Sequence, residues 1–381
     1  MDVISFRNSR VVSSDVLSGL FSISIADGRI ADLSFDTGAA LATVRDFESV
    51  TVFPGFVDVH IHGAVGVDVN DADADGLLRI AEFLAENGVT SWVPTLVPDA
   101  DEDYRRAIGA IDELMRVQAD KPVAQAVGVH YEGVFASEAM CGALRPEYFK
   151  SGLWPGQLPR LEKGVHMITL APEIDGGIAL VEELVKQGWI VSIGHTKADV
   201  GTLDRAFAAG ARHMTHFFNA MTGIHHRDLG VAGWGLGNRE VTFDIIADGI
   251  HVNPKMLEMA CRSKSPDNVS LISDSVAPTG LGDGDYELWG ERITVTGGRT
   301  ENERGSIAGS VITMHDAVKR MLLLGFSEID AAKMASSNPA KLIKLYKLIG
   351  SIEVGKRADL VGIDASGNIV FSMVGGKFVE Q

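Results

Sequence analysis

The chain carries, at residues 54–63, the sequence Pro54-Gly55-Phe56-Val57-Asp58-Val59-His60-Ile61-His62-Gly63. Its apolar run, residues 56–59, predicts a short buried β-strand. Because alternate residues of a strand point to the same side, His60 and His62 are expected to face one side of the sheet together. Imidazole is a standard ligand of zinc and similar divalent ions. The stretch therefore predicts a strand that ends in metal ligands.

Beyond this stretch, short apolar runs alternate with segments of helical periodicity. Helices are predicted over 72–86, 103–117 and 178–186, and strands over 124–129, 165–170, 189–193, 241–246 and 269–272. In the first helix, Leu77, Ile80, Ala81 and Leu84 share one face. This alternation predicts a parallel sheet, and its length suits a (β/α)8 TIM barrel of typically about 250 residues. The alternative is a doubly wound open sheet, but no G-x-G-x-x-G follows the first strand.

Both ends of the chain are rich in short β-type runs. Asp27-Gly28 is a hairpin signal near the N-terminus, and Gly375-Gly376 separates two β-type runs near the C-terminus. We expect the ends to pair into one small β domain, residues 1–53 plus 346–381. The barrel is then expected over residues 54–345.

Polar residues follow several of the predicted strands at their carboxyl ends. They are Glu132, His195, His216 and Asp274, in addition to the His60/His62 pair. Residues at these ends of barrel strands converge on one mouth, where active sites lie. A single histidine such as His130 is more simply a buried ring with its own hydrogen bonds, but the repeated position favours a shared metal centre.

Composition restricts the remaining classes of function. The 381 residues carry a formal net charge of −17, which argues against nucleic-acid binding because phosphate contacts need a basic face. Apolar runs are too short for a transmembrane helix, and the first residues lack a signal-peptide pattern, so a cytoplasmic protein that does not bind membranes is expected. Neither Cys141 nor Cys261 lies in a C-x-x-C pair, which argues against a thiolate zinc site.

The order of the motifs resembles the amidohydrolase superfamily and, within it, the N-acetylglucosamine-6-phosphate deacetylases. The resemblance covers nearly the whole chain. It rests on 54–63, His130-Tyr131-Glu132-Gly133-Val134-Phe135, Gly194-His195-Thr196, Thr215-His216-Phe217-Phe218-Asn219-Ala220-Met221, His225-His226-Arg227, Asp248-Gly249-Ile250-His251, Ser273-Asp274-Ser275-Val276-Ala277-Pro278, Ala308-Gly309-Ser310 and the segment 350–360.

The resemblance implies a TIM barrel with a small β-sandwich built from both chain ends. It also implies that Glu132, His195 and His216 hold a divalent ion, either zinc or iron. Since His60 and His62 are present, a second ion bridged by Glu132 is expected, although some family members bind only one. Asp274 would be the catalytic acid/base and a neighbour of the metal.

The implied reaction is hydrolysis of the N-acetyl group of N-acetylglucosamine 6-phosphate to glucosamine 6-phosphate and acetate. The resemblance places Asn219 and Ala220 at the substrate through the loop after His216, and His251 at the sugar or the acetyl carbonyl. Arg227 would bind the phosphate, including across the interface of a homodimer. The segment Ile307-Ala308-Gly309 would line the pocket.

Two positions depart from the family pattern. Val134 replaces a proline, and Leu144, after Gly142-Ala143, replaces a histidine that normally contacts substrate. The alternative is therefore a deacetylase of N-acetylgalactosamine 6-phosphate or of another N-acyl amine. A non-catalytic barrel is a third possibility, but such proteins usually lose the ligands that this sequence keeps.

Overall fold

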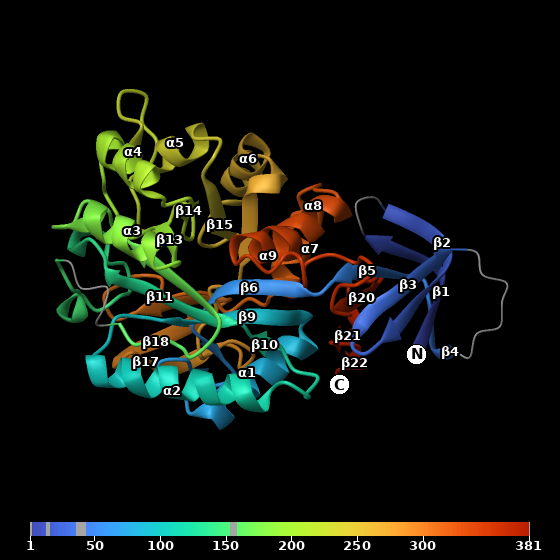
Figure 1. The fold of residues 1–381 in the computed structure, drawn as a ribbon. Helices are drawn as coiled ribbons and strands as arrows, with labels where there is room; N and C mark the ends of the chain where they lie inside the picture. The colour runs from blue at the N-terminus through green and yellow to red at the C-terminus, as the bar shows by residue number, and fades with distance from the viewer. Residues whose placement is uncertain (1, 13–15, 36–42, 153–157, 381) are drawn as a thin grey trace.

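The computed structural model describes residues 2–12, 16–35, 43–152 and 158–380, and a ring of parallel strands forms its centre (Figure 1). Each strand pairs in parallel with the next, and the backbone N–H of Asp274 donates to the carbonyl of His60 where the last strand meets the first. The predicted TIM barrel is confirmed. Its strands are β6 (Phe56–Ile61), β9 (Val89–Leu96), β11 (Gly128–Phe135), β12 (Val165–Leu170), β13 (Ile190–Ile193), β14 (His213–Met214), β15 (Thr242–Ile246) and β16 (Val269–Ile272), and the short β10 (Gln125–Ala126) pairs with β9.

Helices follow the strands along the chain and surround the barrel. They are α1 (Ala74–Glu86), α2 (Asp101–Val117), α3 (Gly177–Lys186), α4 (Val200–Ala209), α5 (Gly230–Gly237), α6 (Pro254–Lys264), α7 (Met314–Leu323), α8 (Glu328–Ala332) and α9 (Asn338–Leu342). The first three confirm the predicted helices. In α1, the four residues assigned to one face are all buried, and the Asp73 side chain caps the first turn by accepting from the N–H of Gly76.

The two chain ends form one sheet, which confirms their predicted pairing. In order across the sheet the strands are β22 (Lys377–Phe378), β21 (Ile369–Val374), β20 (Leu360–Asp364), β5 (Val50–Pro54), β1 (Asp2–Val12), β2 (Val16–Ala26) and β3 (Arg29–Phe35), with β4 (Thr43–Glu48) beside β1. Asp27 and Gly28, both with positive φ, make the predicted hairpin turn. Within the predicted small domain, residues 1, 13–15, 36–42 and 381 lie outside the described residues, and the exact domain boundaries stay a prediction.

An antiparallel sheet that we did not predict is inserted after the last barrel strand. It consists of β17 (Gly284–Leu288), β18 (Glu291–Thr296) and β19 (Arg299–Asn302). A second small hairpin, β7 (Gly63–Ala64) and β8 (Val67–Asp68), follows β6. Both insertions follow strands whose ends carry metal-ligand candidates.

The positions of two predicted ligands within their strands need correction. Glu132 was expected just after a strand, but β11 continues to Phe135, and its register with β12 shifts between Glu132 and Phe135. Likewise, His60 lies inside β6, where the register with β9 shifts after Asp58. Bulges of this kind redirect side chains at the rims of barrels. They bring these ligands to the mouth without ending the strands.

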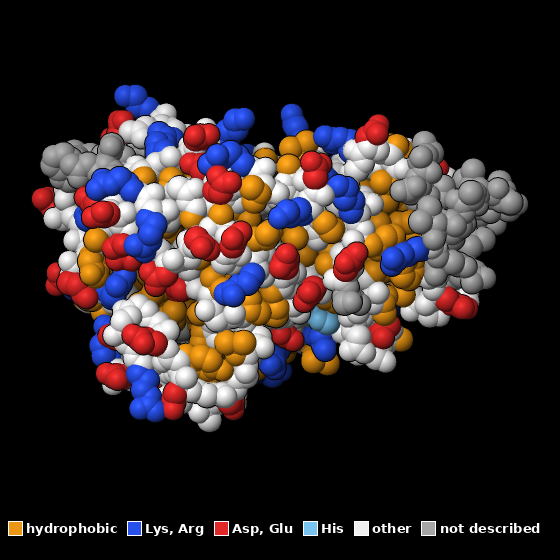
Figure 2. Space-filling view, turned by 90° about the horizontal axis from the view of Figure 1, so that it is seen from below, with side chains coloured by type: hydrophobic (Ala, Val, Ile, Leu, Met, Phe, Trp, Pro, Cys, Tyr) orange, Lys and Arg blue, Asp and Glu red, His pale blue; other side chains and the backbone are white. Residues whose placement is uncertain are grey.

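The surface in Figure 2 mixes acidic and basic side chains and shows no continuous basic stripe on that face. Such a pattern offers no track for a phosphate backbone there. Within the described ranges, none of the helices is both long enough and apolar enough to cross a membrane.

Candidate metal centre

All six predicted metal ligands meet in one place at the barrel mouth. They form two groups, His60 with His62 and Asp274, and Glu132 with His195 and His216, and within each group the candidate ligand atoms lie within 4.8 Å of one another. Every one of the six is buried. Residues from β6, from β11 and from the turns after β13, β14 and β16 therefore converge as the strand-end pattern predicts.

Glu132 joins the two groups. Its Oε1 lies 3.0 Å from Nε2 of His195 and 2.8 Å from Nε2 of His216, and its Oε2 lies 3.2 Å from Nε2 of His62. Asp274 Oδ1 lies 3.3 Å from the same His62 nitrogen. One carboxylate thus faces both groups, as a ligand bridging two ions would.

The hydrogen bonds of the rings fit a bound cation. His62 Nδ1 lies 3.3 Å from the carbonyl of Thr95, and His195 Nδ1 lies 2.8 Å from the carbonyl of Met140. A carbonyl only accepts, so each Nδ1 carries a proton and each Nε2 faces the centre, where a metal-bound ring would offer its lone pair. Yet His195 Nε2 also lies 3.1 Å from His216 Nε2. A cation between these two nitrogens would accept both lone pairs. The carbonyls that bind Nδ1 would then hold the rings in place, as they do for many metal-bound histidines.

The electrostatics of the cluster also attract positive charge. Burial alone would lower the pKa of His62, but hydrogen bonds and negative charge from Asp274 and Glu132 raise it to about 10. In the same way Glu132 raises the pKa of His216 to about 9 against the effect of burial. Burial favours the neutral form of Glu132, yet the histidines around it hold its pKa well below its ordinary value. Bound divalent cations would meet the same demand for positive charge.

Three of the six ligands adopt a left-handed backbone. His195 has φ 48°, His216 has φ 31° and Asp274 has φ 49°. Residues other than glycine rarely adopt this conformation, and it concentrates at functional sites. The turns after β13, β14 and β16 thus fold in an unusual conformation that brings these side chains to the centre.

A cavity of about 290 Å³ opens onto the cluster and contains most of the predicted substrate residues. Ala143, Leu144, Asn219, Ala220, His251, Ile307 and Gly309 all line it. Two of the predicted substrate residues do not line it in the single chain, and their roles stay predictions. Ala308 is fully buried behind its neighbours, and Arg227 is exposed and lies off the cavity, with its side chain on His226. Three lining residues were missed: Gly142, Ser306 and Trp289.

His251 is held on one side of the cavity by Asp248. Asp248 Oδ2 lies 2.6 Å from His251 Nδ1, and Oδ1 accepts the backbone N–H groups of Ile250 and His251, each at 2.8 Å. Burial alone would raise the pKa of Asp248, but these hydrogen bonds lower it below its ordinary value. The carboxylate therefore fixes the ring and leaves His251 Nε2 for contacts beyond this pair.

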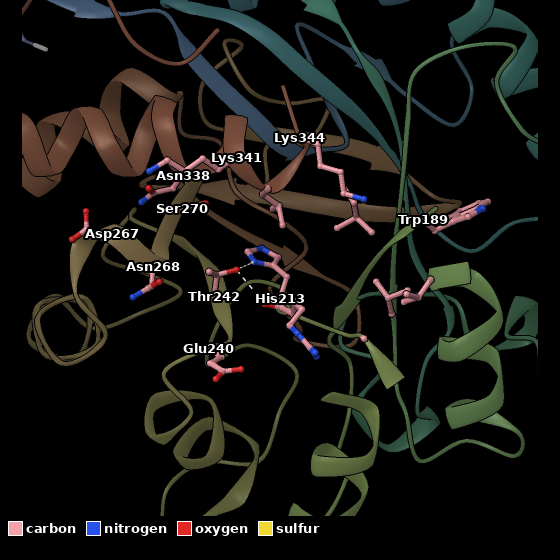
Figure 3. Close-up of a pocket in the computed structure, with 16 residues that line it drawn as sticks. Trp189, His213, Glu240, Thr242, Asp267, Asn268, Ser270, Asn338, Lys341 and Lys344 are labelled. Carbon is pink, nitrogen blue, oxygen red and sulfur yellow. Dashed lines mark hydrogen bonds between the residues drawn. The ribbon is translucent and has the colours of Figure 1, made fainter. Parts of the chain in front are cut away.

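A larger cavity, of about 530 Å³, lies at the opposite end of the barrel (Figure 3). It is lined by residues at the beginnings of strands, including Ile190, His213 and Thr242. His213 is engaged there by Thr242 and Asp244. Because active sites of TIM barrels lie at the carboxyl ends of the strands, the smaller cavity beside the ligand cluster is the candidate site.

Several known proteins are similar to this chain in sequence and in architecture. Residues 51–379 match the model of the amidohydrolase family. The chain is 35% identical to N-acetylgalactosamine-6-phosphate deacetylase of Escherichia coli O157:H7, over 90% of each chain. It is 33% identical to N-acetylglucosamine-6-phosphate deacetylase of Bacillus subtilis, over 93% of this chain and 91% of the relative. Among solved structures, a mutant N-acetyl-D-glucosamine-6-phosphate deacetylase of Mycobacterium smegmatis in complex with N-acetyl-D-glucosamine-6-phosphate superimposes with a TM-score of 0.90, at 30% identity over 100% and 99% of the two chains.

Proposed function

This chain belongs to the amidohydrolase family, and we propose that it hydrolyses the N-acetyl group of N-acetylglucosamine 6-phosphate to glucosamine 6-phosphate and acetate. The observation that carries the proposal is the pair of ligand groups joined by Glu132 at the bottom of the candidate cavity. Relatives of this chain named for the same reaction support the choice of substrate.

The metal centre supplies the part of the chemistry that side chains cannot. A bound divalent ion polarises a carbonyl and lowers the pKa of water from 15.7 toward about 7. The imidazole and carboxylate ligands suit either zinc or iron. Because Glu132 faces both groups, we infer two ions in this chain, one held by His60, His62 and Asp274 and the other by His195 and His216.

Asp274 is proposed as the general base and acid. Burial would raise the pKa of this carboxyl, but positive charge from His60 and the hydrogen bond from His62 lower it, so Asp274 is ionised at neutral pH. It also lines the cavity, where a water attacking the amide must approach. The carboxylate accepts the proton of this water and returns it to the amide nitrogen as the C–N bond breaks. Transfer of this kind typically contributes about 10²–10⁴-fold to the rate.

The sugar is proposed to bind along the rest of the cavity wall. Asn219 and Ala220 follow His216 in one turn, and Ile307 and Gly309 face them from the segment after β19. His251, fixed by Asp248, offers Nε2 to the sugar or to the acetyl oxygen. A donor aimed at a developing oxyanion is usually worth about 3 kcal/mol.

The phosphate requires a cation that the described lining does not provide. Among the described residues, no lysine or arginine lines the cavity. Arg227 is exposed, and Ile224 and Leu229 beside it are 50% and 47% exposed. We infer a homodimer in which this loop packs on a second copy and brings Arg227 to the phosphate of the substrate bound there, since guanidinium binds phosphate oxygens in pairs.

The cytoplasmic location predicted from the sequence is in keeping with Cys141 and Cys261, both free thiols.

N-acetylgalactosamine 6-phosphate is the second candidate substrate. The relative that is 35% identical is named for that sugar, and at Leu144 this chain lacks the histidine of the N-acetylglucosamine-6-phosphate deacetylase pattern. The two substrates differ only in the configuration at C4, so the pocket wall that meets the 4-hydroxyl decides between them.

A substrate panel tests the proposal. Acetate release would be measured from both N-acetylhexosamine 6-phosphates and from the sugars without phosphate, with metal-loaded wild type and Asp274→Asn. Asp285→Asn, an exposed aspartate on β17, is the matched control. We expect the highest kcat/KM on N-acetylglucosamine 6-phosphate, a loss of at least about 10²-fold in Asp274→Asn and no change in the control. Absence of acetate from every sugar phosphate would refute the proposal, and a preference for the galacto epimer would favour the second candidate.

A further inference from the structure

The inserted sheet places one large aromatic side chain in the candidate cavity. The hairpin of β17 and β18 turns at Trp289 and Gly290, whose φ values of 53° and 77° allow a two-residue turn. The indole of Trp289 lines the cavity, and its ring lies edge-on to the His62 ring with centroids 5.5 Å apart. A residue far along the chain therefore stands beside the metal cluster.

Ring and apolar contacts hold this indole. Trp289 Nε1 and the Oδ2 atom of Asp68 on β8 are both buried, and neither has a hydrogen-bond partner among the described residues. Asp68 is itself oriented by the backbone N–H of Asn70 at 2.8 Å. The His62 ring lies edge-on to the indole, and the buried cluster of Val97, Ala136 and Leu144 packs against it. A side chain held in this way forms a wall of definite shape.

Leu144 completes the wall from the opposite segment. It is buried with Val97 and Ala136, and Trp289 packs against this cluster. Arg304, just past β19, donates to the carbonyl of Ala143 at 3.0 Å and so fastens the inserted sheet to the loop that carries Leu144. We call Leu144 and Trp289 together the acyl wall. It is an apolar surface in a cavity that is lined for the rest by histidines, carboxylates, small residues, Asn219 and Ile307.

The chemistry of the substrate indicates what this wall contacts. The scissile carbonyl must lie at the two ligand groups, and the acetyl methyl is only about 1.5 Å from the carbonyl carbon. The methyl is also the one apolar group of an N-acetylhexosamine phosphate, since the rest of the molecule carries hydroxyls and phosphate. An apolar surface directly beside His62 matches that methyl and leaves little room for a longer chain.

We propose, on the basis of the proposed deacetylase function, that the acyl wall of Trp289 and Leu144 is the specificity determinant that restricts the acyl group transferred to water to acetyl. In a hydrophobic pocket one additional methylene typically changes kcat/KM by about 10- to 200-fold. Wild type should therefore prefer N-acetyl over N-propionyl glucosamine 6-phosphate by about 10-fold or more. Removing the indole opens the wall and should reduce this preference.

The first test compares N-acetyl, N-propionyl and N-butyryl glucosamine 6-phosphate. The proteins are metal-loaded wild type, Trp289→Ala, Trp289→Phe and Leu144→Ala, with Glu287→Ala on the exposed part of β17 as the control. We expect the acetyl-to-propionyl ratio of kcat/KM to fall to within about threefold in Trp289→Ala, with Trp289→Phe and Leu144→Ala intermediate. The control should keep the wild-type ratio. A ratio unchanged in both Trp289→Ala and Leu144→Ala, or a wild type without preference, overturns the proposal even if deacetylation itself is confirmed.

A second test does not depend on turnover. Binding of acetate, propionate and butyrate to the same metal-loaded proteins would be measured by calorimetry. We expect wild type to bind acetate at least about 10-fold more tightly than butyrate and Leu144→Ala or Trp289→Ala to lose most of that difference. Equal binding of all three acids by wild type overturns the acyl wall. Selective binding of acetate in a protein that hydrolyses no sugar amide would overturn the proposed function and leave the acyl wall standing.

Discussion

Replacing Asp248 by asparagine should lower kcat/KM for deacetylation by roughly 10- to 100-fold while the protein stays folded. Asparagine can keep the two backbone hydrogen bonds that Asp248 Oδ1 accepts from Ile250 and His251. It cannot keep the charged acceptor that lies 2.6 Å from His251 Nδ1, because the amide nitrogen that replaces Oδ2 is a donor. The His251 ring then loses the acceptor that orients it.

The magnitude follows from that single lost contact. A hydrogen bond to a charged group is worth about 1.5–3 kcal/mol. Each 1.36 kcal/mol corresponds to a factor of ten in rate, so the loss is of the order of 10- to 100-fold. Replacing a group that hydrogen-bonds to a metal-bound histidine and orients it typically lowers activity or metal affinity by a similar factor.

A double-mutant cycle is the appropriate assay. Acetate release would be measured for wild type, Asp248→Asn, His251→Ala and the double variant, with melting temperatures as a check on folding. If Asp248 acts through His251, it adds little in the His251→Ala background. Asp330→Asn, which alters a capping box of α8 remote from the cavity, is the control. Effects of Asp248→Asn that add in full to those of His251→Ala, or that the control reproduces, would refute the reasoning.

Three further predictions concern pH, the phosphate and the backbone. Because the pKa of His62 is raised to about 10, its protonated form stabilises the metal-free fold. This stabilisation is complete below pH 6.5 and is lost as the pH rises toward about 10. Urea unfolding of the metal-free protein should therefore give a lower free energy of unfolding near pH 9.5 than near pH 6, and the opposite trend would contradict the prediction. Arg227→Ala should raise KM for the phosphorylated sugar by about 10-fold or more and leave the unphosphorylated sugar unaffected; equal effects on both would exclude a phosphate contact. Gly133→Ala should destabilise the protein by at least about 1 kcal/mol, because Gly133 has φ 68° and a Cβ would meet Leu144 Cδ1 at 2.2 Å. Gly109→Ala, at a position on α2 where a Cβ meets no other atom, should instead stabilise it by about 0.5–1 kcal/mol. Melting curves of the two variants test both expectations, and a stabilised Gly133→Ala would contradict the first.

Much of the metal centre was predictable because its signals are local. His60 and His62 alternate at the end of one strand, and His195, His216 and Asp274 follow the runs that become β13, β14 and β16. In a parallel barrel, position at the carboxyl end of a strand fixes position in space. The sequence pattern was therefore enough to predict that residues more than two hundred positions apart lie in one cluster.

The parts that were missed depend on contacts between distant segments. Trp289 enters the cavity only because an inserted hairpin folds back over His62. The bulge that keeps Glu132 inside β11 leaves no mark in the periodicity of the run. Arg227 is a different case, because its predicted contact with the phosphate included a route across a homodimer interface, and its loop is exposed in the single chain. Its role therefore stays a prediction.

The most direct test of the central claim, a deacetylase centre in which Glu132 bridges two ions, is to follow metal content and turnover together. Metal would be removed with a chelator until elemental analysis finds none, then zinc or iron would be added back stepwise while acetate release from N-acetylglucosamine 6-phosphate is measured. The account predicts no turnover without metal, full recovery at about two ions per chain in wild type, and no recovery in Glu132→Gln. Undiminished acetate release from the metal-free protein, or full recovery in Glu132→Gln, would contradict it.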